Sequence, residues 1–469
     1  MADTFRQRLS MGHPAISRGT RDQLFRPSLF GRCLFSLNAM FMLFCFGGNV
    51  VAHEGHADHH HVEPPKPADV YLPTAIPDRV ILTWNGDPSS TQAVTWRTSK
   101  GVAQSVGEIA LASADPKFTT QAEQVHGTKQ TLQSDLSEAN YHSVVFTGLT
   151  PDTKYAYRVG DGETWSEWFH FRTASEGSKP FSFIYFGDAQ NDLRSMWSRV
   201  IREAHSDAPK SAFFLHAGDL VNRAESDAEW GEWFFAGGFL NGMIPSIPVP
   251  GNHEQAKVDD QKRLSHHWRP TFELPTNGPS GLEESCYTLI YQGVRFIGLN
   301  SNTMLEEQAE WLDGVLSENE CPWVICTFHH PVFSTGKGRD NEALRKLWKP
   351  VLDKHKVDLV LQGHDHTYGR TGLETPSESN VSAGINKRDT ETGTVYVVSV
   401  SGPKMYDLQE QDFMVRQKAD TQLYQIISID GNELKYEART AVGEVYDAFK
   451  LSKKEGAVNT LTELIPLEQ

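Results

Sequence analysis

The stretch FSFIYFGDAQ, residues 181–190, joins an apolar run to a glycine and an aspartate. Four later segments have the same form, with apolar runs leading into them: GDLVN at 218–222, GNHE at 251–254, FHHP at 328–331 and GHDH at 363–366. Apolar runs of this length, separated by segments of helical period, are typical of buried strands in an α/β sheet. Because ligand sites in such sheets lie beyond the carboxyl ends of the strands, we expect the five segments to meet at one site.

The polar side chains of these segments are of the metal-ligand type. Two aspartates, an asparagine and three histidines form a mixed set of oxygen and nitrogen donors, which suits ions of intermediate hardness such as Zn, Mn or Fe. Any one of them would by default be a turn or capping residue, and a single GD or GNH is uninformative. Five such segments in order at strand ends predict a metal site.

The order GD, GD, GNH, H-x-P and GHxH resembles the calcineurin-like metallophosphoesterases and, within them, the purple acid phosphatase branch. The likeness extends over residues 67–450, and the stretches 268–275, 286–301 and 308–316 also resemble that branch. It implies an α/β catalytic domain at 179–452 in which two stacked sheets lie between helices, an αββα sandwich.

The resemblance also implies which side chains hold the metals. Two ions about 3.5–4 Å apart would be bridged by one carboxylate, would lower the pKa of a bridging water and would clamp the phosphoryl oxygens. The choice of the first histidine of FHHP as a ligand depends on the H-x-P spacing alone. The implied assignments are Asp219 as the bridge, Asp188 and His366 on metal one, and Asn252, His329 and His364 on metal two.

Three further residues are candidates for contacts with the substrate. By the resemblance, His253 lies beside the substrate as a proton donor or phosphate contact; the alternative is a histidine packed under its loop. His330 and Arg370 are weaker candidates for phosphate contacts. Tyr368 is expected to be structural.

Two positions depart from the family pattern. Purple acid phosphatases have a tyrosine three residues after the bridging aspartate, where this chain has Asn222. Other metallophosphoesterases have a histidine two residues after the first aspartate, where this chain has Gln190. We expect an amide oxygen from one of these two residues to bind metal one. Because an amide oxygen gives no tyrosinate colour, we predict a colourless enzyme with Mn, Zn or ferrous iron.

Residues 1–52 have the pattern of a signal peptide. Six arginines against two aspartates precede the apolar run 33–46, and small residues follow at 50–52. The apolar run is too short to span a bilayer comfortably, which disfavours a retained anchor. A true start at Met11 or Met40 would explain the long basic front. We predict export to the periplasm or the medium.

The segments around the catalytic domain are predicted to be supporting structure. Residues 53–67 are rich in histidine and proline and are expected to be flexible, either as a Zn- or Cu-binding tail or as a solvated linker. Short alternating stretches from 68 to 174 predict an all-β sandwich. The segment LTPDTKY at 149–155 resembles the tyrosine corner of fibronectin type III modules, and a similar domain precedes the catalytic one in the purple acid phosphatase branch. A linker is expected at 175–178 and a tail at 453–469.

Composition excludes some partners. With 44 basic and 60 acidic residues the chain has a net charge of −16, which argues against nucleic acid and, once the signal is cleaved, against an anionic membrane surface. Three of the five cysteines, Cys286, Cys321 and Cys326, lie beyond the leader. We expect at most one disulfide and interpret the thiols as buried and free.

These features predict an exported, dinuclear-metal phosphohydrolase that cleaves phosphomonoesters, as acid phosphatases do, by attack of a metal-bridging hydroxide on phosphorus. Its partner would be a small phosphate ester, and the oligomeric state stays open. One alternative is a phosphodiesterase or nucleotide hydrolase of the same fold, with substrate choice in the loops 255–281 and 372–392. A second is a protein that binds metal or a surface glycan without turnover.

Overall fold

The computed structural model describes residues 65–376, 388–389, 393–454 and 456–466. The expected signal segment, nearly all of the His/Pro-rich segment and much of the loop 372–392 lie outside these residues. Structural statements below concern the described part of the chain.

Residues 78–172 form two four-stranded antiparallel sheets that share one apolar core, as the all-β prediction requires. Trp96 of one sheet and Tyr157 of the other are both fully buried in this core. The Tyr155 hydroxyl accepts a hydrogen bond from the Thr150 N–H at 2.8 Å, which confirms the predicted tie between loop and strand. In strand order the sheets consist of β1 (Asp78–Thr83), β2 (Gln92–Ser99), β6 (Glu138–Phe146) and β5 (Thr128–Gln133), and of β4 (Glu123–His126), β3 (Val106–Leu111), β7 (Lys154–Gly160) and β8 (Phe169–Arg172).

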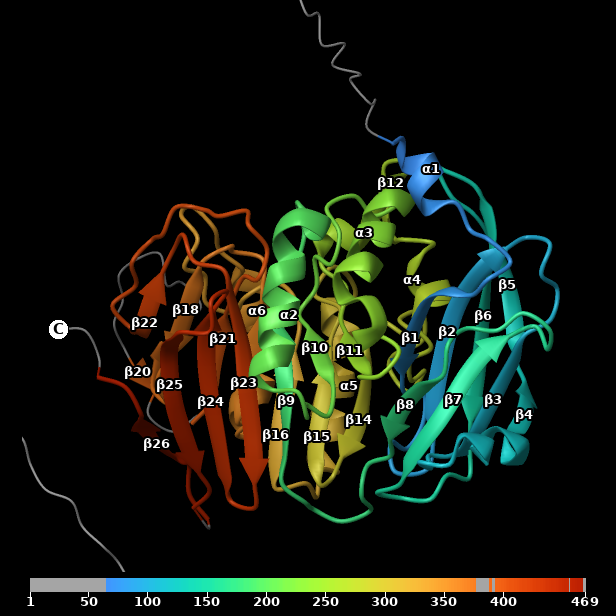
Figure 1. The fold of residues 1–469 in the computed structure, drawn as a ribbon. Coiled ribbons are helices and arrows are strands. Elements are labelled where there is room, and N and C mark those ends of the chain that lie inside the picture. The colour runs from blue at the N-terminus through green and yellow to red at the C-terminus, as the bar shows by residue number, and fades with distance from the viewer. Residues whose placement is uncertain (1–64, 377–387, 390–392, 455, 467–469) are drawn as a thin grey trace, which may run out of the picture. The chain divides into compact units, whose positions relative to one another are not determined.

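The rest of the chain contains two seven-stranded mixed sheets, which confirms the α/β class (Figure 1). In strand order the first sheet consists of β11 (Ser246–Pro248), β10 (Phe214–His216), β9 (Phe181–Phe186), β23 (Leu423–Asp430), β24 (Glu433–Thr440), β25 (Val445–Ser452) and β26 (Thr460–Glu463). The second consists of β14 (Tyr287–Tyr291), β15 (Val294–Gly298), β16 (Trp323–Thr327), β17 (Leu359–Gln362), β21 (Val395–Val398), β18 (Tyr368–Thr371) and β22 (Met414–Lys418). Two-stranded ladders join β12 (Gln255–Val258) to β13 (Gln261–Leu264), and β19 (Thr375–Pro376) to β20 (Arg388–Asp389).

Helices cover part of the outer face of each sheet, so strands such as β10, β16 and β17 are apolar on both sides, whereas β24 alternates buried and exposed residues. In β16 the side chain of Ile325 joins the core between the sheets, whereas those of Val324 and Cys326 join the core beneath the outer helices. This alternation explains why the strand sequences are continuous apolar runs. The helices are α1 (Pro67–Tyr71), α2 (Ser198–Asp207), α3 (Asp227–Gly237), α4 (Trp268–Thr271), α5 (Leu305–Ser317), α6 (Glu342–Leu347) and α7 (Lys349–Lys354), with shorter turns η1 (Pro116–Gln121), η2 (Leu193–Trp197), η3 (Gly238–Leu240) and η4 (Asn252–Glu254).

Two of these elements differ from what local sequence patterns suggest. Asp192 is not the N-cap of a helix: it has a left-handed backbone and no side-chain cap, because the chain first forms the π-helical turn η2. The late strands do not make a sheet of their own. Instead β23 pairs antiparallel with β9 and carries β24 to β26 into the first sheet, while β21 inserts beside β17 in the second.

A buried tyrosine joins the two sheets below the carboxyl ends of their strands. The hydroxyl of Tyr185, on β9, donates to the carbonyl of Gln362, on β17. Tyr185 is fully buried, so this bond crosses the core between the sheets.

A buried ion-pair cluster connects the all-β part to α3. The carboxylate of Asp227 accepts from the guanidinium of Arg79 at 2.6 Å and from that of Arg97 at 3.0 Å. All three side chains are nearly inaccessible to solvent. Trp230 and Trp233 of the same helix are buried in the core, so α3 packs there rather than forming the wall of a substrate pocket.

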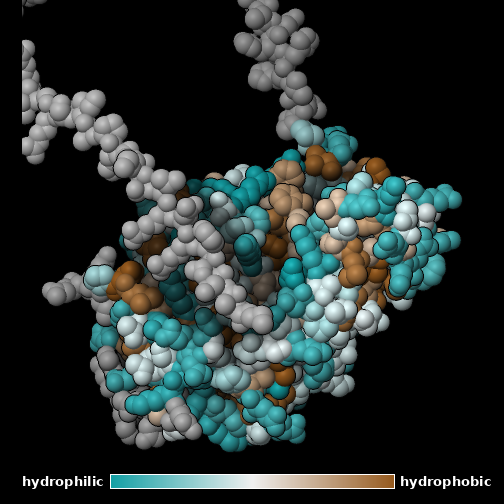
Figure 2. Space-filling model, turned by 60° about the horizontal axis from the view of Figure 1, so that its bottom comes forward, coloured by the Kyte–Doolittle hydropathy of each residue, from teal (hydrophilic) through white to brown (hydrophobic). Residues whose placement is uncertain are grey.

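The surface carries both hydrophilic and hydrophobic side chains (Figure 2). The face drawn in Figure 2 is mostly hydrophilic, and its hydrophobic side chains form separate patches, as is ordinary for a folded protein. Among the described residues no helix is long and apolar enough to cross a membrane. The three described cysteines are free thiols.

Candidate metal centre

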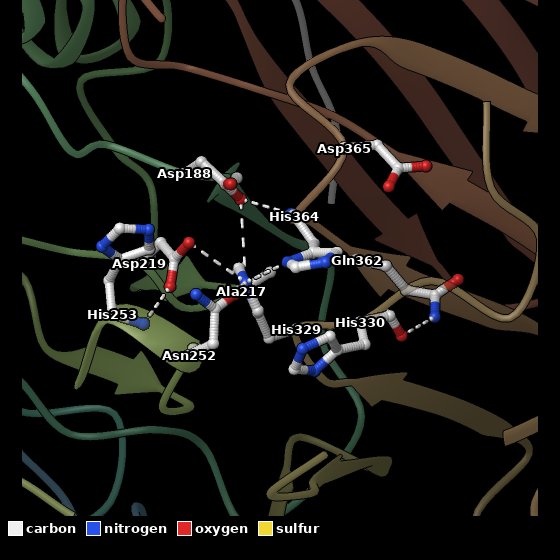
Figure 3. A network of polar contacts seen from close by, with 12 residues as sticks. Asp188, Ala217, Asp219, Asn252, His253, His329, His330, Gln362, His364 and Asp365 are labelled. Atoms are coloured by element: carbon white, nitrogen blue, oxygen red, sulfur yellow. Dashed lines mark hydrogen bonds and ion pairs between the residues drawn. The ribbon is translucent and has the colours of Figure 1, made fainter. Parts of the chain in front are cut away.

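The five sequence segments meet at one end of the two sheets. Strands β9, β10 and β11 run parallel in the first sheet, and β16 and β17 run parallel in the second, so their carboxyl ends converge. Figure 3 shows His329 with Asp188, Asp219, Asn252 and His364 around it. One sheet thus supplies the carboxylates and the amide, and the other supplies the imidazoles.

One donor group surrounds the Nε2 atom of His329. This nitrogen lies 3.1 Å from Asn252 Oδ1, 3.2 Å from Asp219 Oδ2 and 3.1 Å from His364 Nδ1. Bonds of about 2.0–2.2 Å to a single ion place tetrahedral donors roughly 3.3–3.6 Å apart. The four atoms therefore need to move only slightly to hold one ion.

A second donor group consists of Asp188, Asp219 and His366. His366 Nε2 lies 3.1 Å from Asp188 Oδ2, an oxygen that is fully buried and has no hydrogen-bond partner. The side-chain amide of Gln190 lies 3.0 Å from both Asp219 Oδ2 and His366 Nε2. The same Asp219 oxygen thus faces both groups, while its Oδ1 accepts the His253 backbone N–H at 2.9 Å.

Backbone carbonyls fix the orientation of two imidazoles. His329 Nδ1 donates to the carbonyl of Ala217 at 2.9 Å, and His366 Nδ1 donates to that of Lys404 at 2.7 Å. With the proton held on Nδ1, each Nε2 presents its lone pair to the centre. These contacts set the tautomer that a metal ligand needs.

The backbone approaches the centre closely. A Cβ on Gly363 would lie 2.0 Å from Asp188 Oδ1, and one on Gly251 would lie 2.1 Å from Asp219 Oδ1. Asp219 itself, like the two ligand histidines of GHDH, has a positive φ. Strained backbone of this kind concentrates at functional sites.

The charges of the centre favour a cation. Burial would lower the pKa of His329, but the carboxylates of Asp219 and Asp188 outweigh it and raise this pKa to about 9. Burial acts to raise the pKa of Asp219, yet the charge on His329 holds it well below its usual range. A proton on His329 Nε2 thus offsets one of the two buried negative charges, and a bound metal ion would take the place of this proton and use the Nε2 lone pair. The oxygen and nitrogen donors, with one buried oxygen unpartnered, fit divalent ions.

Glu254 is a residue that the sequence reasoning missed, although it stands in the GNHE segment. Its fully buried carboxylate accepts backbone N–H groups from Asp219 and Gly251 through Oε2, each at 2.8 Å, and from Leu220 and Val221 through Oε1 at 2.8 and 3.2 Å. Burial raises the pKa of Glu254, but all four partners are donors, so the ionised form fits the site. Glu254 therefore links the GDLVN segment to the GNHE segment.

His253 and Asn222 lie at the edge of the centre. His253 Nδ1 donates to the backbone carbonyl of Asn222 at 2.6 Å, which leaves Nε2 for other contacts. In the described structure no hydrogen bond joins the Asn222 side chain to the centre. Of the two amides considered for metal one, the amide of Gln190 is the one that lies beside Asp219 and His366 in the second donor group.

His330 is close to the centre but outside both donor groups. The Ser301 hydroxyl donates to His330 Nδ1 at 2.8 Å, and the ring lies 4.3 Å from that of His364. The structure therefore places His329, and not His330, in a group of side chains that could hold a metal ion.

Arg370 is not available for phosphate, contrary to the sequence prediction. Its guanidinium is fully buried, donating to Asp447 Oδ2 at 2.6 Å and to Glu463 Oε2 at 2.8 Å. Tyr368 donates to the same Asp447 carboxylate at 2.7 Å and is structural, as expected.

Another basic side chain does reach the centre. Arg339 donates to the carbonyl of His364 at 2.8 Å, and its guanidinium lies over the ring of Tyr406 at 4.5 Å. The Lys404 ammonium lies 5.3 Å from the centre of the same ring, which is 4.5 Å from that of His366. No sequence motif marks these three residues, because loops distant in the chain bring them together.

Comparison with known proteins gives two family matches. Residues 77–173 match the family described as Purple acid Phosphatase, N-terminal domain, and residues 181–368 match that described as Calcineurin-like phosphoesterase. An uncharacterized protein of Mycobacterium tuberculosis is 26% identical over 365 residues, which cover 68% of each chain. Fe(3+)-Zn(2+) purple acid phosphatase 12 of Arabidopsis thaliana is 25% identical over 282 residues, covering 56% of this chain and 59% of that protein.

A solved structure shares the fold. Purple acid phosphatase PPD1 from yellow lupin (Lupinus luteus) seeds aligns with a TM-score of 0.66 at 18% identity, covering 82% of this chain and 76% of that one.

Proposed function

The chain belongs to the purple acid phosphatase-like branch of the calcineurin-like phosphoesterases and is a metal-dependent phosphoester hydrolase, and from this premise we propose that it is an exported phosphatase that hydrolyses phosphomonoesters with two bound metal ions. The observation that carries the proposal is the position of Asp219 Oδ2. This oxygen lies 3.2 Å from His329 in one donor group and 3.0 Å from the Gln190 amide in the other.

The donor groups suggest how each ion is held. Asp219, Asn252, His329 and His364 would hold one ion, and Asp188, Asp219 and His366 the other. When bound, such ions supply a water of lowered pKa and offset the charge of the phosphoryl oxygens.

Gln190 would complete the second set. Rotating its amide by half a turn brings the oxygen, which is buried and has no partner, to the point where the nitrogen now lies. Because an amide replaces a phenolate, we propose a colourless enzyme with Mn, Zn or ferrous iron. A strong visible charge-transfer band in the pure protein would contradict this assignment.

His253 would protonate the leaving oxygen. Its Nδ1–H is held by the Asn222 carbonyl at 2.6 Å, so the proton to be given away sits on Nε2. His253→Ala should then lose far more rate on alkyl phosphates, whose leaving groups are poor, than on nitrophenyl phosphate. Equal losses on the two substrates would refute this role.

Phosphodiester or nucleotide hydrolysis is a second candidate, favoured by one observation. Tyr406 presents an aromatic ring beside His366, with Arg339 and Lys404 close to that ring. An aromatic ring flanked by two cations suits a substrate with a base or a second phosphate. Arg339→Gln should raise the KM for such a substrate more than it raises the KM for nitrophenyl phosphate.

The deciding experiment is hydrolysis of nitrophenyl phosphate and bis-nitrophenyl phosphate by protein that has been stripped of metal and reloaded with Mn, Zn or Fe. Metal-dependent turnover that favours the monoester supports the phosphatase, and a preference for the diester supports the second candidate. No turnover with any metal would favour a binding protein instead. Export depends on the sequence of residues 1–52 and is tested by locating the mature protein.

A further inference from the structure

Three potential ligand side chains lie together away from the residues of the metal centre. Glu225 belongs to the segment before α3, and His266 and His267 immediately precede α4. Each offers one ligand atom, and these atoms all lie within 4.8 Å of one another. His266 Nδ1 is 2.5 Å from Glu225 Oε2.

His267 lacks the partners that a buried imidazole needs. The residue is 0% exposed, yet neither ring nitrogen makes a hydrogen bond. The nearest carboxylate oxygen, Asp227 Oδ1, is 4.0 Å away and is already bound by Arg79 at 2.6 Å. Burying a polar group without a partner is destabilising, so such a group requires an explanation.

The ring of His267 is held in place and is ready to bind a cation. Trp230 stacks on it with ring centres 5.9 Å apart. Burial lowers the pKa of His267 to about 3, so the imidazole is neutral at physiological pH and its lone pair is free. The ring of His266 lies 5.0 Å away and lines a cavity of about 390 Å³, which gives an ion a path from solvent.

We propose that Glu225, His266 and His267 form a third metal site, for a divalent ion of the zinc type. Two neutral imidazoles and one carboxylate are a donor set that zinc accepts, and three protein ligands leave a fourth position for water. The carboxylate and His266 need only separate from their present contact to admit the ion.

The site would stabilise a segment that orients the proposed proton donor. Ser265, next to the histidines, donates to the Ala224 carbonyl at 2.7 Å. Asn222 lies two residues before Ala224, and its carbonyl accepts the Nδ1–H of His253. An ion shared by Glu225 and the histidines would therefore hold residues 222–225 at the Glu225 end, next to the contact between Ser265 and Ala224.

The test measures zinc bound per chain after dialysis of the full protein against Zn²⁺. Glu225→Gln and His266→Asn change partly exposed side chains and should each bind one zinc fewer than the wild type. His355→Asn is the matched control, since His355 pairs with Asp313 at 2.7 Å but belongs to no three-ligand group. Zinc bound by the histidines of residues 53–61 is common to all four proteins and cancels.

A second measurement separates a metal from a water. Cobalt added to the wild type should give an absorption contribution that is missing from His266→Asn and present in His355→Asn. Equal zinc content in all four proteins, or a loss shared by the His355 control, would overturn the proposal and leave a bound water as the partner of His267.

Discussion

Replacing Glu254 by glutamine tests whether the two ligand segments are held by this one carboxylate. Its four contacts are backbone N–H groups, two on each oxygen. A glutamine keeps the shape but has one oxygen, so in either orientation its NH₂ group faces two N–H donors. At about 1.5–3 kcal/mol for each hydrogen bond to a charged group, the variant should lose about 3–6 kcal/mol of unfolding free energy.

The loss should extend to the metals, because Glu254 holds the backbone of Asp219, which faces both donor groups. We expect lower zinc or manganese content together with a lower midpoint of urea unfolding. Glu138→Gln is the matched control, since Glu138 is exposed and accepts from Lys100 at 3.0 Å. If Glu254→Gln unfolds like the wild type and keeps its metal, the reasoning fails.

Two further predictions concern stability. Asp227→Ala leaves two buried guanidinium groups without their shared carboxylate, so it should lower the unfolding free energy by about 3–5 kcal/mol. This loss should be measured as a lower Tm. Glu138→Ala removes an exposed carboxylate that pairs with Lys100 and should leave the Tm unchanged. Burial raises the pKa of Glu284 from 4.5 to about 7, so its favourable contribution is complete below pH about 4.5 and is lost as the pH rises through 7. Glu284→Gln should therefore gain about 1–3 kcal/mol relative to the wild type between pH 5 and 8, and an unchanged difference across that range would contradict the shift.

The sequence predicted where the strands end better than it predicted the contacts between segments that lie far apart in the chain. The runs before Asp188, Asp219 and His329 are buried on both sides, so their apolar pattern identified the strands and the edge where the ligands meet. The grouping of the proposed ligands came from a family resemblance, and the structure brings Asn252 and Asp219 within 3.1–3.2 Å of His329 Nε2.

Contacts between segments that are distant in the chain could not be predicted from local sequence patterns. Arg370 follows a ligand motif closely, but its partners lie 77 and 93 residues later in the chain. Asp192 is of a residue type that favours N-cap positions, yet its backbone is left-handed and the chain forms a π-helical turn after it. Glu254 was overlooked because its partners are backbone groups, which carry no residue signature.

The hydrogen bond from Tyr185 to Gln362 has a consequence for how this centre can be altered. It ties the strand that leads to Asp188 to the strand that leads to His364, beneath the place where oxygen donors from one sheet meet nitrogen donors from the other. The spacing between the oxygen donors and the nitrogen donors therefore depends on how far apart the sheets stand. Substitutions among the aromatic residues of the core would then change this spacing without replacing any donor side chain.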